Sequence, residues 1–176
     1  MIERGWGNNE GKHVVSKRQT ACISRDQVDL RRVEDAIGAG FPDVDGLLTM
    51  RPEHSDSPDE DPFGFKLELK SEKRPARLSS PIRFALEKRR AQIEFMRKRY
   101  TMGEAAYFFV QVGEAADAMR YLVPGDAGAR LREGMVESEI AVLCATENGM
   151  VFNKTVKPAT VITRIRTCYK RRFFRP

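Results

Sequence analysis

The sequence predicts an α/β fold in which a central mixed β-sheet is flanked by helices. Two observations carry this prediction: short apolar runs with strand-like patterns recur along the chain, and a long segment of helical periodicity separates two of them. The chain has 176 residues, of which 41% are hydrophobic, so it fits a single domain with one core. We expect that domain to span residues 1–176, with its core at about residues 24–125 and a basic extension at about residues 126–176.

The first half of the chain contains three predicted strands. Gln27 to Glu34 alternates apolar and polar residues, and Asp43 to Met50 and Phe63 to Lys70 are further strand-like runs. The stretch from Arg51 to Pro62 is rich in acid, serine and proline, which indicates a solvated loop between two antiparallel neighbours. A short helix is expected over Asn9 to Arg18.

The segment from Ser80 to Met102 has the features of a long helix. Ser80 is the expected N-cap, Pro81 lies in the first turn, and Gly103 follows the end. Apolar residues recur at roughly helical spacing, namely Ile82, Leu86, Ile93, Met96 and Tyr100. The sequence therefore predicts a crossover helix that packs by one apolar stripe and exposes cations elsewhere.

The remainder of the chain consists of shorter predicted elements. Ala105 to Val112 is short, aromatic and β-branched in character and ends at Gly113, which is typical of a buried strand. A further strand is expected at Ala118 to Val123, followed by a short helix at Ala127 to Glu133 and a strand at Ile140 to Cys144. A terminal helix begins at about Ala159 and ends in a basic tail.

Charge and composition narrow the class of protein. Lys and Arg number 31 against 25 Asp and Glu, a net charge of +6, which suits a partner that carries phosphates, although solubility alone explains it too. The three cysteines are too few and too widely spaced for a disulfide framework or a zinc site. The N-terminus is charged where a signal peptide is apolar, and no segment approaches the roughly 18 apolar residues of a membrane span. We expect a cytoplasmic protein without a membrane partner.

The strand from Phe63 to Lys70 carries the most informative pattern. Side chains of a strand alternate between its two faces, so Glu68 and Lys70 project side by side while Leu67 and Leu69 face the core. Such a pair also occurs by chance on solvated sheet faces, and alone it does not indicate catalysis. The pair becomes a more specific indication of a catalytic site because Asp43 lies on the preceding predicted strand.

Asp43 begins the neighbouring strand after Pro42, and hairpin pairing brings it towards Glu68. Two converging carboxylates repel each other unless a cation lies between them, and hard oxygen ligands suit Mg²⁺, for which Mn²⁺ can substitute. A metal-bound water is a nucleophile, and the metal neutralises charge that develops on a phosphodiester. Lys70 would orient that water or stabilise the transition state. The pattern therefore predicts a magnesium-dependent hydrolytic site.

Four motifs follow one another over about the central half of the chain: VEDAIGAGFPDVDG, KLELKSEK, LSSPIRFALEKRRAQIEFM and AAYFFVQV. In this order they resemble the PD-(D/E)XK nuclease superfamily, and within it the short phage and bacterial relatives of VRR-NUC nucleases and Holliday junction resolvases. The resemblance implies a restriction-endonuclease-like core. It also implies that Asp43 and Glu68 are metal ligands together with the backbone carbonyl of Leu69, and that Lys70 is the catalytic lysine.

The resemblance implies roles for residues outside the strand pair as well. Relatives often place a glutamine on the crossover helix three residues before an aromatic, as Gln92 and Phe95 stand here. Gln92 would contact the catalytic lysine or DNA, and the alternative is a polar residue on a solvated helix face. A further catalytic acid usually comes from the preceding segment, where Glu34 is the candidate and Glu10 its competitor. Asp45 is a possible accessory ligand.

Basic residues beyond the catalytic strand are candidates for DNA contact, because phosphate neutralisation supplies most sequence-independent affinity. The better candidates lie just past the strand, where the site must open, and the others lie on the following helix, where charged faces are often merely solvated. They are Lys73, Arg74, Arg77, Arg89, Arg90 and Lys98. The tail from Arg164 to Arg175 either binds the phosphate backbone of DNA or is a frayed terminus.

Together these expectations describe a magnesium-dependent DNA endonuclease that hydrolyses phosphodiester bonds. It would act on branched or duplex DNA in phage or bacterial replication, recombination or repair. A homodimer would favour a Holliday junction resolvase, because two symmetric cuts need two sites. The alternative is a non-catalytic DNA-binding or virion-associated protein that retains the nuclease fold. A basic protein-interaction module is supported by charge alone.

Overall fold

The computed structural model of the chain describes residues 28–32, 42–48, 63–86, 90–114, 117–153, 156 and 158–173. Within these ranges, six strands form one sheet in the order β1-β2-β3-β4-β5-β6. The strands are β1 (Val28–Arg32), β2 (Val44–Leu48), β3 (Phe63–Glu72), β4 (Ala105–Val112), β5 (Met119–Pro124) and β6 (Met150–Asn153). Neighbouring strands pair antiparallel except β3 and β4, which are parallel. The predicted α/β fold with a mixed sheet is confirmed.

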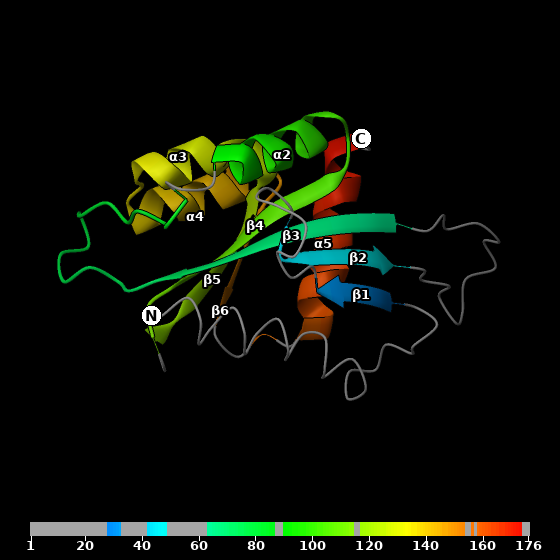
Figure 1. Cartoon of the computed structure of the whole chain (residues 1–176). Helices are drawn as coiled ribbons and strands as arrows, with labels where there is room; N and C mark the ends of the chain where they lie inside the picture. Colours follow the sequence, from blue (N-terminus) through cyan, green and yellow to red (C-terminus); the bar gives the residue numbers. More distant parts are fainter. Residues whose placement is uncertain are drawn as a thin grey trace.

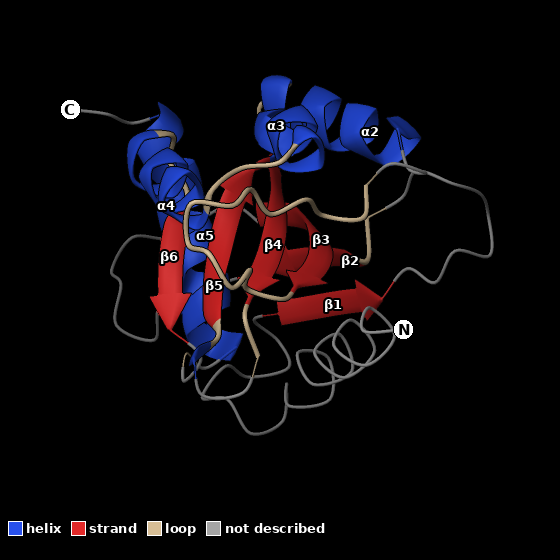
Figure 2. Ribbon diagram, turned by 90° about the vertical axis from the view of Figure 1, so that its left-hand side faces the viewer, coloured by secondary structure: helices blue, strands red, loops and turns tan. Residues whose placement is uncertain are grey.

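Helices cover both faces of this sheet. They are α2 (Arg90–Thr101), α3 (Gly128–Glu133), α4 (Glu137–Thr146) and α5 (Pro158–Phe173), with a short 3-10 turn, η3 (Gly125–Ala127), before α3. Figure 1 shows α2, α3 and α4 on one side of the sheet and α5 on the other, and Figure 2 shows α2 and α3 above the sheet after a quarter turn. As predicted, a helix, α2, connects the parallel strands β3 and β4. Among the described residues, no helix combines the length and hydropathy that a membrane span requires.

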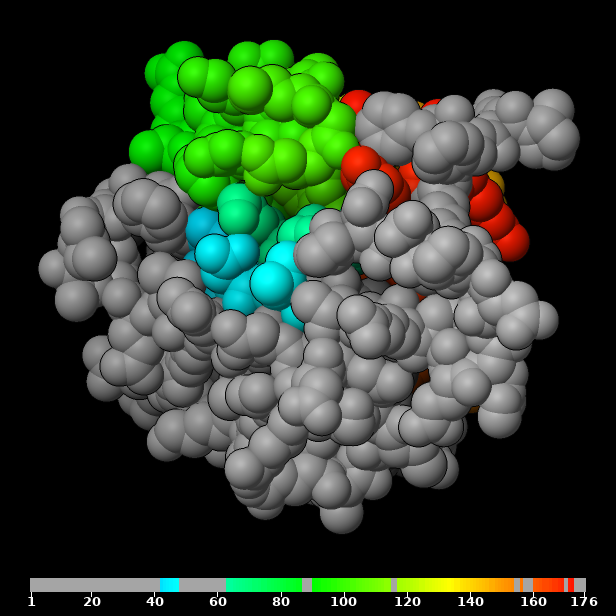
Figure 3. Space-filling view, turned by 90° about the vertical axis from the view of Figure 1, so that its right-hand side faces the viewer, coloured from blue at the N-terminus to red at the C-terminus, as the bar shows by residue number. Residues whose placement is uncertain are grey.

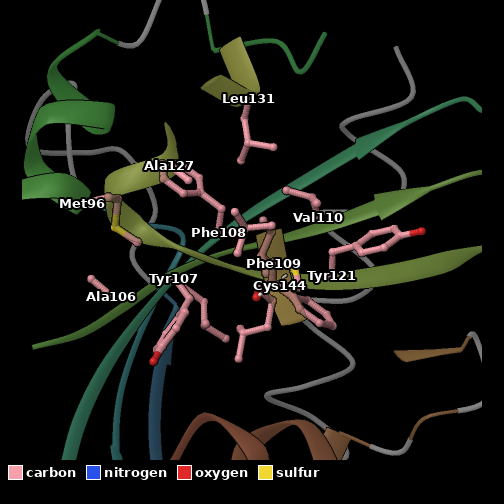
Figure 4. Close-up of a cluster of buried hydrophobic side chains, with 14 of the residues drawn as sticks. Met96, Ala106, Tyr107, Phe108, Phe109, Val110, Tyr121, Ala127, Leu131 and Cys144 are labelled. Carbon is pink, nitrogen blue, oxygen red and sulfur yellow. Dashed lines mark hydrogen bonds between the residues drawn. The ribbon is translucent and has the colours of Figure 1, made fainter. Parts of the chain in front are cut away.

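The core is centred on β4, whose eight residues are all buried. Its side chains alternate between the two faces of the sheet, so Phe108 points towards Ala127 and Leu131 while Tyr107 points to the opposite side (Figure 4). Burial of each large apolar side chain contributes about 1.5–3 kcal/mol to the free energy of unfolding. A strand covered on both faces is a nearly continuous apolar run, interrupted here only by Gln111, which is why this element was predictable over its full length.

The predicted helix from Ser80 to Met102 is wrong in its first part, because α2 begins at Arg90. Residues 80–86 are not helical, and Ile82 instead exchanges backbone hydrogen bonds with Met135 at 2.9 and 3.1 Å. The burial of this segment has a period of two, since Ile82, Phe84 and Leu86 are buried while the residues between them are exposed. The apolar–polar alternation of IRFAL was therefore a better guide to this part of the chain than the N-cap pattern at Ser80 and Pro81. Only the second half of the segment follows helical spacing.

The predicted strand from Ile140 to Cys144 is also wrong, because these residues lie within α4. Ile140, Leu143 and Cys144 are buried, which is the spacing of one helix face. The Glu139 side chain accepts the Val136 backbone N–H at 2.9 Å and so satisfies one of the free donors at the start of the helix. A five-residue apolar run does not distinguish a strand from a buried helix by periodicity.

Residues beyond about 125, expected as a basic extension, contribute directly to the sheet and the core. Strand β6, which was not predicted, pairs antiparallel with β5. The predicted terminal helix is α5, and its residues Ile165 and Cys168 are wholly buried. The predicted helix over Asn9 to Arg18 and the predicted loop over Arg51 to Pro62 lie outside the described residues.

Candidate active site

The pairing of β2 with β3 places acidic residues of the two strands on one sheet face. Val44 lies opposite Leu67 and Asp45 lies opposite Lys66. Continued by one residue, this register puts Asp43 opposite Glu68, and directly opposed residues of antiparallel strands have Cβ atoms about 4.5–5.5 Å apart. Figure 3 shows β2 at the surface beside α2, with atoms of β3 between them.

The proline before Asp43 has a clear structural consequence. The same register puts Pro42 opposite Leu69. Pro42 has no backbone N–H, so it cannot donate a ladder hydrogen bond to the Leu69 carbonyl. The Leu69 backbone N–H instead donates to Asp43 Oδ2 at 2.9 Å. Because the N–H and C=O of one strand residue point to the same side, the Leu69 carbonyl also faces the edge where Asp43 lies. Asp43 and the predicted carbonyl ligand are therefore brought together by backbone geometry.

Glu68 and Lys70 form a buried ion pair on the same face. Lys70 Nζ lies 2.8 Å from Glu68 Oε1, and the two side chains are 4% and 0% exposed. Their parallel neighbours on β4 are Phe108 and Val110, so the pair is flanked by apolar side chains. A buried ion pair adds little net stability compared with well-packed apolar residues, because desolvation offsets the attraction between the charges.

Gln92 comes to this pair from the crossover helix. Its side chain is buried on the face of α2 that also buries Ile93 and Met96. The Gln92 amide Nε2 donates a hydrogen bond to Glu68 Oε2. The predicted alternative for Gln92, a solvated helix face, is wrong, because the Gln92 side chain is buried. A carboxylate held by Lys70 on one oxygen and by Gln92 on the other has a fixed orientation.

Asp45 lies on the same face but engages a different partner. Lys66 Nζ lies 2.9 Å from Asp45 Oδ1, and the Asp45 side chain is 48% exposed. This cross-strand pair is more solvated than the pair of Glu68 and Lys70. It supports strand pairing at the rim of the site, and no contact connects Asp45 with Glu68 in the described part of the chain.

The donor atoms brought together suit a hard divalent cation. Among the described residues, no three His, Cys, Asp or Glu side chains lie close enough together to hold a metal ion as a group. The predicted oxygen ligands within the described residues are the carboxylates of Asp43 and Glu68 and the Leu69 carbonyl, whereas Glu34 and Glu10 lie outside those residues. Mg²⁺ binds through one or two carboxylates and retains several waters, so an all-oxygen set of this size fits it.

Arg74, a predicted DNA contact, is instead held by the protein. Its guanidinium makes two hydrogen bonds to Glu137, at 2.6 and 2.8 Å, and contacts Asp117 Oδ2 at 2.7 Å. The Tyr121 hydroxyl donates to the same Glu137 carboxylate at 2.7 Å. The hydrogen bond to Glu137 raises the pKa of Arg74, and the hydrogen bond from Arg74 lowers the pKa of Glu137. This network ties the segment after β3 to the start of α4, and the role of Arg74 in DNA contact stays a prediction.

Sequence patterns offered no signal for this network, because Arg74 and Glu137 are 63 residues apart. Other predicted DNA contacts remain at the surface. Lys73 is exposed and lies 3.3 Å from Glu114. Arg77, Arg90 and Lys98 are exposed and form no ion pair with any residue that the structure describes. Arg89 lies outside the described residues.

The fold and the site together define an α/β protein with two carboxylates, a lysine and a glutamine gathered on one face of its sheet. Comparison of the chain with protein-family models, with curated proteins and with solved structures finds no match.

Proposed function

We propose that the protein is a metal-dependent DNA endonuclease of the PD-(D/E)XK type with a restriction-endonuclease-like core. One observation carries the proposal: Glu68 and Lys70 form a buried ion pair on the sheet face that also bears Asp43. Gln92 orients Glu68 from the crossover helix between the two parallel strands. The motifs and this geometry support the same reaction, hydrolysis of a phosphodiester bond.

The charge of the site supports a cation between the two carboxylates. Asp43 and Glu68 carry two negative charges and Lys70 carries one positive charge, which leaves one negative charge in excess. Asp43, Glu68 and the Leu69 carbonyl would hold Mg²⁺ or Mn²⁺. The ion, when bound, supplies an activated water and neutralises charge that develops on the phosphate.

Each remaining residue of the site has a distinct role in this proposal. Lys70 keeps a positive charge beside the Glu68 carboxylate, where it stabilises negative charge that develops on the phosphate in a partly desolvated environment. Gln92 keeps the carboxylate in one orientation, since it binds the oxygen that Lys70 does not. The Asp43 carboxylate is oriented by the Leu69 N–H. All three contacts preorganise the site before substrate binds.

The decisive experiment measures cleavage of branched, single-stranded and linear duplex DNA with Mg²⁺ or Mn²⁺. We expect Asp43→Asn to lower the cleavage rate by about 100-fold or more, the scale of loss when one preorganised electrostatic group is removed. Glu94→Gln is the matched control, because Glu94 is an exposed carboxylate of α2 that pairs only with Arg97 among the described residues. Equal cleavage by wild type and Asp43→Asn would rule out the proposed site.

One observation favours a second candidate, a DNA-binding protein that has lost turnover. The Glu68 side chain has no exposed surface, and Lys70 is 4% exposed, which is also the geometry of a purely structural ion pair. A measurement of metal binding distinguishes an endonuclease from a DNA-binding protein without turnover. An endonuclease is stabilised against thermal unfolding by millimolar Mg²⁺, because a ligand that binds only the folded state raises the melting temperature, and Asp43→Asn abolishes this effect. A protein without turnover binds DNA but shows no stabilisation by metal.

A further inference from the structure

The helix on the opposite side of the sheet from the candidate active site carries unusually uniform charge. α5 (Pro158–Phe173) contains no acidic residue. Its basic residues are Arg164, Arg166, Lys170, Arg171 and Arg172. Figure 1 shows most of α5 on the side of the sheet opposite α3 and α4, with its C-terminal end near the end of α2, where Arg172 lies over the Tyr100 ring. A helix without compensating acids produces a positive potential on that face.

Apolar contacts hold this helix firmly against the sheet. Its buried residues are Val161, Ile162, Ile165 and Cys168. Tyr169 packs on Phe63 of β3 with ring centroids 4.6 Å apart. The Arg172 guanidinium lies 3.7 Å from the centroid of the Tyr100 ring. Because one side of α5 is fixed in the core, its outer side is a rigid surface.

The exposed residues of that outer side are all threonine or arginine. Within the described part of α5 they are Thr160, Thr163, Arg164 and Arg171, which we call the α5 stripe. Arg164 and Arg171 are seven residues apart, which is about 10.5 Å along a helix axis. Neither forms an ion pair with a residue that the structure describes, whereas Lys73, Arg74, Arg97, Arg99 and Arg130 all do.

The residue types of the α5 stripe indicate which class of partner it binds. Protein interfaces are built on buried aromatic or apolar residues, and the described part of α5 exposes no large hydrophobic residue. Arginine and threonine are instead the side chains that contact the phosphates of nucleic acids. Two arginines that pair with no acidic side chain among the described residues favour a polyphosphate backbone over an acidic peptide.

We propose that the α5 stripe is a second DNA-binding surface, which holds one duplex segment while the face with Asp43 and Glu68 engages another. The choice of DNA rests on the proposed function. A protein with phosphate-binding surfaces on opposite faces of its sheet binds two arms of a branched molecule at once. This arrangement gives a preference for branched over linear DNA through the second set of phosphate contacts.

The test counts short DNA molecules bound by the full chain in the absence of divalent metal. A labelled duplex of about one helical turn, about 10 base pairs, is titrated into wild type and into Arg164→Glu/Arg171→Glu. We expect two duplexes per wild-type chain and one per variant chain. With a four-way junction, the plot of log affinity against log salt should be less steep by about 2 in the variant, because each lost phosphate contact removes about 0.9 from the slope.

Two controls keep the result specific. Arg130→Glu/Arg132→Glu on α3 makes the same change in net charge and should still bind two duplexes. Arg164→Gln/Arg171→Gln removes the charges without reversing them and replaces the first variant if that one does not fold, as judged by circular dichroism.

Three outcomes would overturn the inference. They are an unchanged stoichiometry and salt slope in the α5 variants, an equal loss in the α3 control, and loss of both duplexes in the α5 variants. Failure of the proposed function is seen in the cleavage assay, whereas failure of this inference is seen in the number of duplexes bound, a measurement that requires no cleavage. A protein that binds two duplexes but never cleaves would retain the second surface and lose the nuclease assignment.

Discussion

The carboxylate of Asp43 accepts the backbone N–H of Leu69 at 2.9 Å. This contact joins the residue just before β2 to the middle of β3, beyond the Val44–Leu67 pair that ends the backbone ladder between the two strands. It orients a predicted metal ligand and satisfies a strand donor at the same time. The two roles can be separated by substitution.

Asp43→Asn and Asp43→Ala should differ in stability but not in cleavage. The asparagine retains a carbonyl oxygen that can accept the Leu69 N–H, whereas alanine leaves that donor without its side-chain partner. We expect Asp43→Ala to unfold about 0.5–1.5 kcal/mol more easily than Asp43→Asn, the usual net contribution of one hydrogen bond. Urea denaturation measures this difference, and both variants should lack cleavage. Retained cleavage in Asp43→Asn would show that the carboxylate has only a structural role.

The pair of Glu68 and Lys70 should show strong energetic coupling. Lys70→Met leaves the Glu68 carboxylate buried without its cation, which typically costs about 3–5 kcal/mol of unfolding free energy. The double variant Glu68→Gln/Lys70→Met removes both charges and should recover a large part of that loss. A double-mutant cycle in urea gives the coupling energy.

A matched cycle with Asp45→Asn and Lys66→Met tests the more solvated pair on the same sheet face. We expect its coupling to be about 1 kcal/mol or less. If both cycles give the same coupling energy, the burial of Glu68 and Lys70 does not have the energetic importance inferred from the structure.

Acid should weaken the link between β3 and α4. The hydrogen bond from Arg74 holds the pKa of Glu137 below its ordinary value of 4.5. The folded protein then binds fewer protons than the unfolded chain, so this stabilisation is fully present above about pH 4.5 and is lost as the pH falls through the lowered pKa. Urea denaturation of wild type and Glu137→Gln, from about pH 7 down to about pH 3, should show a shallower pH dependence for the variant.

Glu133→Gln is the control for that experiment, because Glu133 is exposed at the end of α3 and forms no ion pair with a described residue. Its pH dependence should match the wild type. Parallel curves for wild type and Glu137→Gln would show that Arg74 does not hold the Glu137 carboxyl in its charged form.

Substitution of Arg74 should lower the stability of the protein, whereas substitution of Arg77 should lower its DNA affinity. Arg74→Ala removes the partner of Glu137 and should lower the melting temperature, because it leaves a partly buried carboxylate without its cation. Arg77→Ala changes an exposed side chain and should leave the melting temperature unchanged while DNA affinity falls. Fluorescence anisotropy at several salt concentrations should show a slope reduced by about 0.9 for Arg77→Ala. An unchanged slope would remove Arg77 from the DNA-binding surface.

Local patterns predicted those elements whose burial follows one period without interruption. β4 is buried over all eight residues and apolar at all but Gln111, and its bounds were predicted correctly. The helix predicted after β3 was wrong in its first part because two periods meet there: burial alternates with a period of two over residues 82–86, and helical spacing begins only at α2. The run from Ile140 to Cys144 was too short to show a period at all, and it folds as part of α4.

By itself, the sequence determined that Glu68 and Lys70 share a face of β3, because the strand repeat of two is a property of the backbone. It also determined that a helix lies between the two parallel strands. The tertiary structure decided which distant groups meet these side chains: Gln92 contacts Glu68, and Arg74 contacts Glu137 instead of solvent. Such partners depend on how whole elements pack across tens of residues, and no local repeat in the chain encodes that packing.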